Sequence, residues 1–377
     1  MKRYNPNIYI AIFLIAVLLF SVMTIYAFGA HKTSSISVSA KSATLYLPET
    51  SDFLYSKAAD EKMPMASTTK IMTALVALEN SLLTEEVNIH PSAIGTEGSS
   101  AYLKENDVLS MEELIYALLL QSANDAAVAI AIHIGGDIEG FCDLMNDKCT
   151  ELGLTNTHFT NPHGLDDKEH YTTAKELAII TGEALKNEKF KEIVSTKKKN
   201  FTTENRSRTY INHNKLLSMY DGCIGVKTGF TKRCGRCLVS AAERDGLTYV
   251  CVTLNAPDDW RDHKEMLDYG FDAMEKIQFS KEFDHVYGLP VIGGEADNVI
   301  VANPEGANII IEKGEHSITS HVKLNRYAIA PIEKGEVLGE IIYTLDGKET
   351  ARVQLVATES VKQKEKRFID KIKTIFK

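Results

Sequence analysis

The sequence predicts an α+β protein whose larger first domain carries an antiparallel sheet and whose second domain is all-β. Residues 71–78 and 111–134 are almost wholly apolar, which is typical of buried helices. Residues 223–255 contain three strand-like runs joined by short turns, which indicates an antiparallel meander. From residue 283 to 357, short β-rich runs alternate with turns that contain Gly and Asp. This change of pattern predicts two different architectures in one chain.

The larger domain is expected over residues 35–278. Two short strand-like runs around a turn come first, and helical and strand patterns then follow in order. A last helix at about 260–277 carries the only tryptophan, Trp260. The small all-β domain is expected over residues 283–357, where Asp346-Gly347 is a hairpin signal. The expected elements of the larger domain are strands within 43–62, a helix within 64–80 that includes Ser67 and Lys70, helices at 111–121, 125–136, 139–152 and 173–187, and strands at 223–230, 235–243 and 247–255.

The two ends of the chain predict contact with a membrane. Lys2 and Arg3 precede an apolar run of 23 residues, 8–30, which is typical of an export signal and is long enough to span a bilayer. Residues 1–34 are therefore expected to be a signal peptide or membrane anchor and a linker, with the rest extracytoplasmic. Residues 358–377 are expected to form a basic amphipathic tail for the membrane surface, the alternative being a solvated charged tail.

Net charge and cysteine usage exclude some classes of function. The formal net charge of −9 argues against nucleic acid as a partner. Six cysteines outside the cell permit disulfides, but a domain of this size does not need them, and most lie in apolar patterns typical of buried thiols. Cys234 and Cys237 form a single C-x-x-C motif. Without a second pair or a nearby histidine cluster, a zinc site is disfavoured. A local redox pair is the minority interpretation. We therefore expect no zinc site at these cysteines.

The motif S-x-x-K opens the first apolar helix at Ser67 and Lys70. At this spacing both side chains lie on one face of the helix. A lysine in an apolar site has a lowered pKa and can take the proton of a serine hydroxyl. Two other copies of the motif, at Ser195 and Ser320, lie in a charge run and in a predicted strand, where this geometry is absent. Taken alone, Ser67 and Lys70 would be a helix cap and a lysine that reaches water.

Two further motifs change that balance. Ser122 and Asn124 lie in the break between two apolar helices, where polar side chains either cap the helix ends or face a cleft. In "GVKTGF", Lys227 and Thr228 precede Gly229 inside a strand, and a mid-strand glycine marks close approach of another backbone or a ligand. Taken singly, this strand would be an edge strand protected by its lysine.

Together, S-x-x-K, S-x-N and K-T-G in this order form the signature of penicillin-recognising serine enzymes. The chain resembles the low-molecular-mass D-alanyl-D-alanine carboxypeptidases, penicillin-binding proteins of the S11 peptidase type. The stretches "LGLTNTHFTNPHGLDD" and "INHNKLL" also resemble that family, over about residues 40–278. The resemblance implies a β-lactamase/transpeptidase-like fold, with helices on both sides of the antiparallel sheet.

The resemblance also implies a role for each motif residue. Ser67 would attack the carbonyl between the two terminal D-alanines of a peptidoglycan stem pentapeptide, and Lys70 would take its proton. Ser122 and Asn124 would complete the proton relay and hold the substrate. Lys227 and Thr228 would bind the terminal carboxylate of the substrate. The backbone N–H groups of Ser67 and of Phe230, the residue after Gly229, would bind the oxyanion. Water would hydrolyse the acyl-enzyme, and β-lactam antibiotics would acylate the same serine. The resemblance also implies that no metal and no cofactor are required.

Several positions depart from the family pattern or carry no assigned chemistry. His213 stands where family members often have another basic residue, so a carboxylate contact there would depend on pH; a surface-loop histidine is the alternative. Cys234 stands where a small residue is common near the cleft edge, which would make the site sensitive to thiol reagents. His163 and His170 are expected to organise a loop rather than to catalyse.

Three other functions fit parts of the pattern. A β-lactamase would need a further glutamate for deacylation and usually has S-D-N where this chain has Ser-Ala-Asn. A D-alanyl endopeptidase is a variant that the motifs do not separate from a carboxypeptidase. A non-catalytic wall-binding scaffold is disfavoured by the presence of Ser67, Lys70 and Lys227 together.

Overall fold

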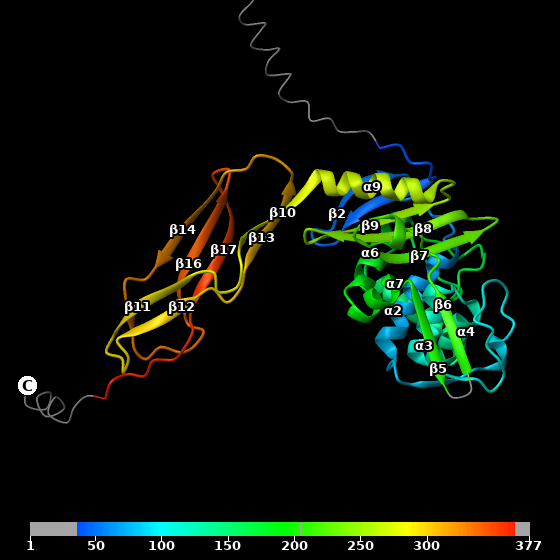
Figure 1. Ribbon diagram of the computed structural model, residues 1–377, viewed down its shortest axis with the longest axis horizontal. Helices are drawn as coiled ribbons and strands as arrows, with labels where there is room; N and C mark the ends of the chain where they lie inside the picture. The colour runs from blue at the N-terminus through cyan, green and yellow to red at the C-terminus, as the bar shows by residue number, and fades with distance from the viewer. Residues whose placement is uncertain (1–35, 204–205, 366–377) are drawn as a thin grey trace, which may run out of the picture. The chain divides into compact units, whose positions relative to one another are not determined.

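The computed structural model describes residues 36–203 and 206–365. Its larger domain is built on a five-stranded antiparallel sheet with helices on both faces (Figure 1). The three strands predicted at 223–255 are adjacent in this sheet and antiparallel, as expected. In spatial order the strands are β2 (Asp52–Lys57), β1 (Ser42–Leu47), β9 (Leu247–Leu254), β8 (Gly235–Arg244) and β7 (Cys223–Thr231).

Helices α6 (Ala174–Leu185) and α9 (Asp259–Ala273) cover opposite faces of the sheet. Leu45 and Tyr46 are neighbours in β1, so their side chains point to opposite faces. A Cβ added to Gly270 of α9 would lie 2.9 Å from Leu45 Cδ2, and one added to Gly182 of α6 would lie 3.1 Å from Tyr46 Cε1. Glycines therefore let both helices approach the sheet closely.

Below the sheet, as Figure 1 is drawn, the remaining helices of the domain form a second, mostly helical region. The apolar runs predicted as buried helices are α2, α3 and α4, and their side chains form the main core. The chain breaks between α3 and α4 at residues 121–123, so Ser122 lies in the break as expected, whereas Asn124 is already the first residue of α4. The helices of this region are α2 (Lys70–Asn80), α3 (Met111–Leu120), α4 (Asn124–Gly135), α5 (Ile138–Glu151), α7 (Glu188–Ser195) and α8 (Leu216–Met219), with 3-10 turns η1 (Ala66–Thr69) and η2 (Pro91–Ala93).

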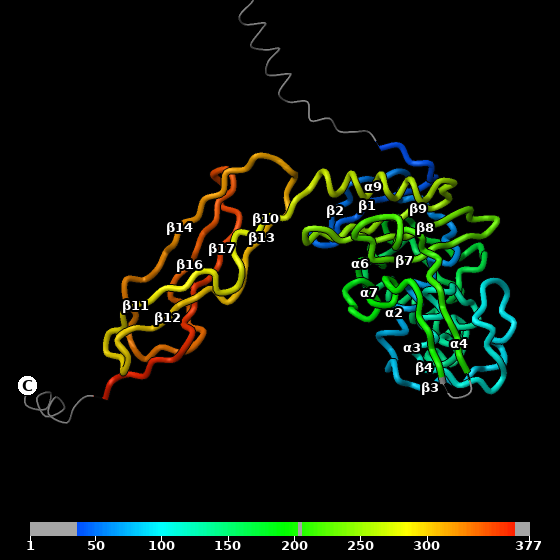
Figure 2. The backbone as a smooth tube through the Cα atoms, in the orientation of Figure 1, coloured from blue at the N-terminus to red at the C-terminus, as the bar shows by residue number. Residues whose placement is uncertain are grey.

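Two small hairpins complete this region, and the sequence did not predict them. One joins β3 (Glu86–Asn88) to β4 (Val108–Ser110). The other joins β5 (Lys198–Thr203) to β6 (Arg206–Ile211), within a stretch that reads as a charge run. Figure 2 shows the backbone course of both regions.

The helix expected at 260–277 ends earlier, at Ala273, and residues 274–280 form strand β10. The extension was wrong because Met274–Ser280 pairs with β13 along its length, and its alternating exposure is that of a strand. The second domain is all-β, as predicted, with a two-stranded sheet and a six-stranded one. Its strands are β10 (Met274–Ser280), β11 (Val286–Ile292), β12 (Asn298–Ala302), β13 (Ala307–Glu312), β14 (Ile318–Leu324), β15 (Ala328–Ile329), β16 (Val337–Leu345) and β17 (Lys348–Ala357).

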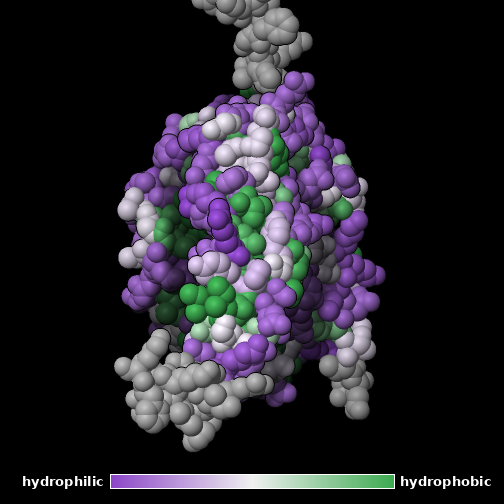
Figure 3. All heavy atoms as spheres, turned by 90° about the vertical axis from the view of Figure 1, so that its left-hand side faces the viewer, coloured by the Kyte–Doolittle hydropathy of each residue, from purple (hydrophilic) through white to green (hydrophobic). Residues whose placement is uncertain are grey.

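The β-domain has small apolar cores of its own and a mixed surface. Leu289, Val299 and Val301 belong to one buried cluster, and Ile341 and Leu355 to another. On the face shown in Figure 3, hydrophobic side chains form small groups among hydrophilic ones. Within residues 36–203 and 206–365, no helix has the length and apolar character to cross a bilayer. The N-terminal apolar run and residues 366–377 of the basic tail lie outside these residues. The start of the predicted tail was wrong, because Val361 is buried in the β-domain, where it pairs with Ile332, and Gln363 pairs with Gly294.

Candidate active site

Ser67 lies in the 3-10 turn η1, directly before helix α2. Ala66 has a left-handed backbone, with φ 49°, which turns the chain sharply into η1. The hydroxyl of Thr68 donates a hydrogen bond to Met65 O (2.7 Å), and that of Thr69 donates one to Ala66 O (2.8 Å). These two bonds fix the turn that presents Ser67. The α-helix itself begins only at Lys70, so the prediction that both motif residues lie on the helix was wrong for Ser67.

Lys70, the first residue of α2, is completely buried and surrounded by oxygen atoms. Its Nζ lies 3.0 Å from Ser67 Oγ, 2.7 Å from Asn124 Oδ1 and 2.6 Å from the backbone carbonyl oxygen of His163. The expected contact between Ser67 and Lys70 is therefore present, and Asn124 joins it. Two of the three neighbours of the amine are carbonyl oxygens, which can only accept hydrogen bonds.

The pKa of Lys70 is held well below its usual value, first by burial and then by the charge of Lys227, with Asp125 opposing the shift. An uncharged amine has two N–H donors and one lone pair. Asn124 Oδ1 and the carbonyl of His163 accept the two N–H groups, so the lone pair is left for the Ser67 hydroxyl. This geometry is that of a base that can take the serine proton.

Asn124 is placed by the loop that precedes α3, and it does not cap a helix. The N-cap of α4 is Ala123, which makes no side-chain cap bond. Asn124 Nδ2 instead donates to the carbonyl of Glu97 (2.5 Å), and Asn124 N donates to Ser99 O (2.7 Å). The bond to Glu97 fixes the orientation of the side-chain amide, so that Oδ1 is the atom that faces Lys70.

Ser122 lies at the same break, buried and in a left-handed backbone conformation with φ 61°. It makes no side-chain hydrogen bond within residues 36–203 and 206–365, so the structure does not join it directly to Lys70. A left-handed backbone is unfavourable for a residue other than glycine, and such strain is concentrated at functional sites.

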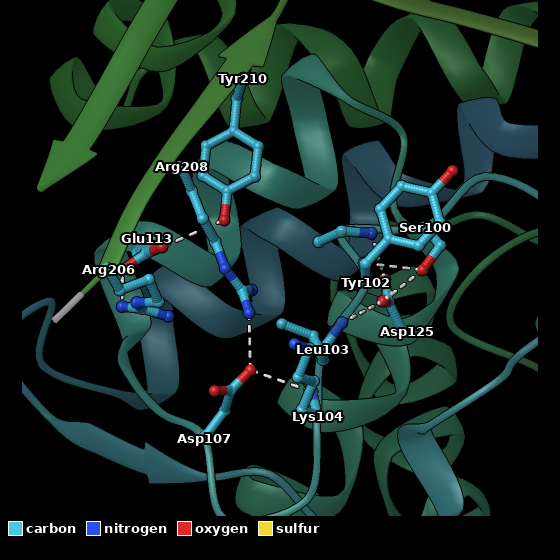
Figure 4. Close-up of polar contacts among 11 residues, drawn as sticks. Ser100, Tyr102, Leu103, Lys104, Asp107, Glu113, Asp125, Arg206, Arg208 and Tyr210 are labelled. Atoms are coloured by element: carbon cyan, nitrogen blue, oxygen red, sulfur yellow. Dashed lines mark hydrogen bonds and ion pairs between the residues drawn. The ribbon is translucent and has the colours of Figure 1, made fainter.

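The neighbouring carboxylate, Asp125, was not recognised from the sequence and holds the loop that orients Asn124. It accepts hydrogen bonds from Ser100 Oγ (2.6 Å), Ala101 N (2.9 Å) and Leu103 N (3.1 Å), as Figure 4 shows in part. Asp125 is nearly fully buried, so these bonds compensate the cost of its desolvation.

Strand β7 forms the opposite wall and comes very close to the nucleophile turn. A Cβ added to Gly229 would lie 3.1 Å from Ser67 N and 3.2 Å from Met65 O. The glycine is therefore needed for the strand to approach, as the mid-strand position predicted. Phe230, the next residue, is 66% exposed.

Lys227 is also buried, and its Nζ donates to the backbone carbonyl oxygen of Thr228 (2.9 Å). Burial lowers the pKa of Lys227 to about 7. The charge of this lysine is thus available to a bound anion near neutral pH, and the half-buried Thr228 stands beside it on the strand.

The loop at 160–165 supplies the carbonyl of His163 and is held tightly against the start of α2. Asn161 Oδ1 accepts from Gly164 N (2.7 Å), and Thr73 Oγ1 donates to Pro162 O (2.6 Å). Gly164 has φ +88°, and a Cβ there would overlap Ala66 O. This carbonyl was missed because a backbone acceptor leaves no mark in the residue types.

His170 forms a hydrogen bond with Thr69 of the turn that carries Ser67. Thr160 N donates to His170 Nδ1 (3.1 Å), so Nε2 carries the proton and donates to Thr69 Oγ1 (2.7 Å). Burial lowers the pKa of His170 to about 4 and that of His163 to about 3, which keeps both rings neutral. These contacts agree with the expectation that both histidines organise the loop.

His213 lies in a loop that is held by its two neighbours. Asn212 Nδ2 donates to Val194 O (3.0 Å), and Asn214 N donates to Asn212 Oδ1 (2.9 Å). The ring of His213 reaches solvent, while its packed side and the charge of Lys227 lower its pKa. The lowered pKa favours the uncharged form of the His213 ring at neutral pH.

The expected sensitivity of Cys234 to thiol reagents is not supported. Cys234 is buried, its Sγ lies 3.3 Å from Asp166 Oδ1, and burial raises its pKa to about 11. A protonated, inaccessible thiol reacts poorly. All six cysteines are free, in agreement with the absence of a disulfide framework, and the described residues contain no cluster of His, Cys, Asp and Glu suited to a metal.

A serine hydroxyl 3.0 Å from the amine of a buried lysine, and a closely approaching strand that carries a second buried lysine, define the class of serine acyl-transfer enzymes. Two family models match the chain: D-alanyl-D-alanine carboxypeptidase over residues 29–258, and the C-terminal domain of penicillin-binding protein 5 over residues 275–363. The chain belongs to the D-alanyl-D-alanine carboxypeptidase family.

Individual relatives are similar in sequence or in structure, two of them over most of the chain and one over the larger domain only. It is 31% identical to the D-alanyl-D-alanine carboxypeptidase DacF of Bacillus subtilis, over 96% of this chain and 95% of that protein. Penicillin-binding protein 5 of Haemophilus influenzae has a similar solved structure, with a TM-score of 0.63 and 30% identity over 87% of this chain and 98% of that one. The DD-transpeptidase of Streptomyces K15 covers 62% of this chain and 98% of its own, with 35% identity and a TM-score of 0.59.

Proposed function

We propose that this protein is a serine-type D-alanyl-D-alanine carboxypeptidase that removes the terminal D-alanine from peptidoglycan stem pentapeptides. The observation that carries the proposal is the position of Lys70 Nζ, 3.0 Å from Ser67 Oγ, with two carbonyl oxygens taking its N–H groups. Membership of the family and the names of the relatives supply the substrate class.

Ser67 attacks the carbonyl between the two D-alanines, and Lys70 accepts the hydroxyl proton. The backbone N–H groups of Ser67 and Phe230 stabilise the oxyanion, because close contact at Gly229 brings these two segments together. The C–N bond then breaks, and the proton held by Lys70 passes to the departing D-alanine amine, with Ser122 completing the relay.

Lys227, Thr228 and His213 bind the terminal carboxylate of the substrate. The charged form of Lys227 has a second effect, because it lowers the pKa of Lys70 and so favours the free base. Asn124 holds the substrate backbone while its Oδ1 orients the amine. Water finally hydrolyses the ester at Ser67, and a β-lactam acylates the same oxygen.

The test combines fluorescent penicillin labelling with a D-alanine release assay on a pentapeptide. Wild type is expected to label and to release D-alanine, whereas Ser67→Ala should do neither. Ser320→Ala, in another S-x-x-K that lies in strand β14, is the matched control and should behave as wild type. Labelling of Ser67→Ala, or rapid release of hydrolysed penicillin from wild type, would contradict the proposal; the second result would indicate a β-lactamase.

We further propose that the protein acts outside the cytoplasm at the membrane surface. The apolar run at 8–30 and the basic pattern at 361–377 support this location. Deletion of residues 366–377, which leaves the buried Val361 in place, should move the processed protein from the membrane fraction to the soluble fraction. Unchanged fractionation of processed protein would contradict a role for the tail.

A further inference from the structure

One half of the six-stranded sheet of the β-domain has an apolar outer face. Every second residue of β11 is exposed, and the buried Leu289 lies between exposed positions. Alternate residues of a strand share a face, so the exposed ones point away from the core. They are Val286, Gly288, Pro290 and Ile292. Val286 is 56% exposed and Ile292 is 52% exposed, although the solvated face of an antiparallel sheet is usually polar.

The strands on either side of β11 extend this face. Ile329 of β15 pairs with Ile292, and Ile300 of β12 pairs with Gly288. Paired residues point to the same side of a sheet, so both isoleucines lie on the outer face; Ile329 is 67% exposed and Ile300 is 40% exposed. No residue of β11, β12 or β15 is charged. Hydrophobic side chains gather in groups in Figure 3, which faces the side where β11 and β12 lie in Figure 1. We call this surface the apolar sheet face: Val286, Pro290, Ile292, Ile300 and Ile329.

The other half of the same sheet has the polar outer face expected of a solvated sheet. Glu340 of β16 pairs with Gln354 of β17, on the side opposite to the buried Ile341. The Glu340 carboxylate forms ion pairs with Arg352 (2.8 Å) and with Lys323 of β14 (3.4 Å). The change from ion pairs to aliphatic side chains within one sheet therefore separates a solvated half from a half suited to contact, since contiguous exposed apolar surface marks interaction sites.

The chain leaves the β-domain beside the apolar sheet face. Lys364 N donates to the carbonyl oxygen of Gly293 (2.8 Å), and Gly293 directly follows Ile292. Residue 366 is two residues further on, at most about 7 Å along an extended chain. From there the sequence continues with the basic amphipathic pattern that runs to Lys377. A tail bound to lipid would therefore hold the apolar sheet face close to the same surface.

The residues around this face also suit the boundary between lipid and water. Tyr327, which precedes β15, is 51% exposed, and tyrosine is enriched at that boundary. The turn between β11 and β12 carries two carboxylates, Glu295 and Asp297, and the adjoining segment carries Lys362 and Lys364. Lys364 forms an ion pair with Asp297 (3.5 Å). Equal numbers of opposite charges at this edge leave no net repulsion from an anionic surface.

We propose that the apolar sheet face lies on the lipid surface, so that the β-domain itself contacts the membrane beside the tail. The inference rests on the proposed membrane location and is independent of the chemistry at Ser67. A second copy of this chain, or the tail folded back onto the sheet, would cover the same face and shield it from lipid. Contact of this face with acyl chains is therefore the observation that separates the three occupants.

Quenching from within the bilayer tests this contact. The full chain with Ile329→Cys is labelled with nitrobenzoxadiazole and reconstituted into vesicles of phosphatidylcholine and phosphatidylglycerol whose acyl chains carry a nitroxide near the head group. The matched control is the same label at Ile318→Cys, a 45% exposed position of β14 at the opposite edge of the sheet. Quenching at residue 329 should be about threefold stronger than at residue 318, because a bound apolar face reaches the boundary of head groups and acyl chains. The unsubstituted chain measures background labelling of the native cysteines.

A third label, at Ile372→Cys, reports on the tail. Quenching at residue 372 with no excess at residue 329 over residue 318 would overturn the inference and leave the role of the tail intact. Quenching at none of the three positions would overturn the proposed location as well. D-alanine release by each labelled variant tests the catalytic proposal separately, and circular dichroism checks that the β-domain is folded.

Discussion

The site contains two buried lysines, Lys70 and Lys227, and their surroundings differ. Both have lowered pKa values, and burial is the first cause for each. Lys70 has three oxygen neighbours at 2.6–3.0 Å, contributed by a helix, a helix start and a loop. Lys227 has one, the carbonyl of the adjacent Thr228. Burial therefore lowers the pKa of both amines, and the hydrogen-bond partners of each amine determine its chemical role.

The two lysines act in opposite charge states, Lys70 when uncharged and Lys227 when protonated. Lys70 is useful as a free base, since its N–H groups are taken and its lone pair faces Ser67. Lys227 is useful when protonated, and its pKa of about 7 leaves both forms populated near neutral pH. A bound carboxylate favours the charged form of Lys227, and that charge in turn lowers the pKa of Lys70.

The largest effect is expected from Lys70→Met, which removes the base but keeps an apolar side chain of similar length. Acylation by penicillin should slow by about 10²–10⁴-fold, the typical contribution of a general base. Lys70→Arg should not restore it, because a guanidinium remains protonated. Stopped-flow labelling measures the rate, and circular dichroism checks the fold. Near-normal acylation in Lys70→Met would show that another group takes the proton.

Lys227→Gln is expected to have a smaller effect and a different one. The KM for a peptide that ends in D-Ala-D-Ala should rise by about 10²-fold, because a buried charge partner of the carboxylate is lost. The pKa of Lys70 should rise when the neighbouring positive charge is removed, so the acidic limb of the pH profile should move to higher pH.

The control for that experiment is Lys232→Gln, an exposed lysine directly after β7. It should leave both KM and the pH profile unchanged. If the acidic limb stayed in place in Lys227→Gln, the two lysines would not be electrostatically coupled.

The smallest effect is expected from His213→Arg. The pKa of His213 is lowered below its usual 6.5, so the ring is neutral at pH 7 and an arginine adds a charge there. Binding of a D-Ala-D-Ala peptide to the inactive Ser67→Ala protein should tighten about threefold at pH 7, as for an exposed ion pair. The gain should shrink below the pKa of His213, where the histidine is itself charged. Titration calorimetry at two pH values measures this, and equal affinities at pH 7 would place His213 outside the carboxylate site.

Much of the larger domain could be predicted from the sequence because its core elements carry strong patterns. The apolar runs at 71–78 and 111–134 form buried helices, and the strand pattern at 223–255 forms the meander. The hairpin β5–β6 was missed because its strands bury little apolar surface. It is held instead by polar contacts between distant segments, with Arg208 bonded to Asp107 (2.6 Å) and Tyr210 to Glu113 (3.1 Å), as Figure 4 shows.

The sequence predicted the parts of the site that are formed by side chains, but not those formed by backbone atoms. Ser67, Lys70 and Asn124 meet as the motifs indicated, and Gly229 provides the close approach. The carbonyl of His163 could not be found, since any residue type offers the same atom. Asp125 could have been suspected, because a carboxylate next to Asn124 in an apolar helix needs several donors to remain buried.

The contacts of Lys70 join parts of the chain that are 54 and 93 residues away in sequence. Before these segments meet, the lysine is an ordinary solvated cation next to an ordinary alcohol, and the pair has no special chemistry. The nucleophile is therefore activated only after these segments have come together. A nascent or partly unfolded chain would be inert toward antibiotic and substrate alike, and labelling of the polypeptide would serve as a direct count of correctly assembled molecules.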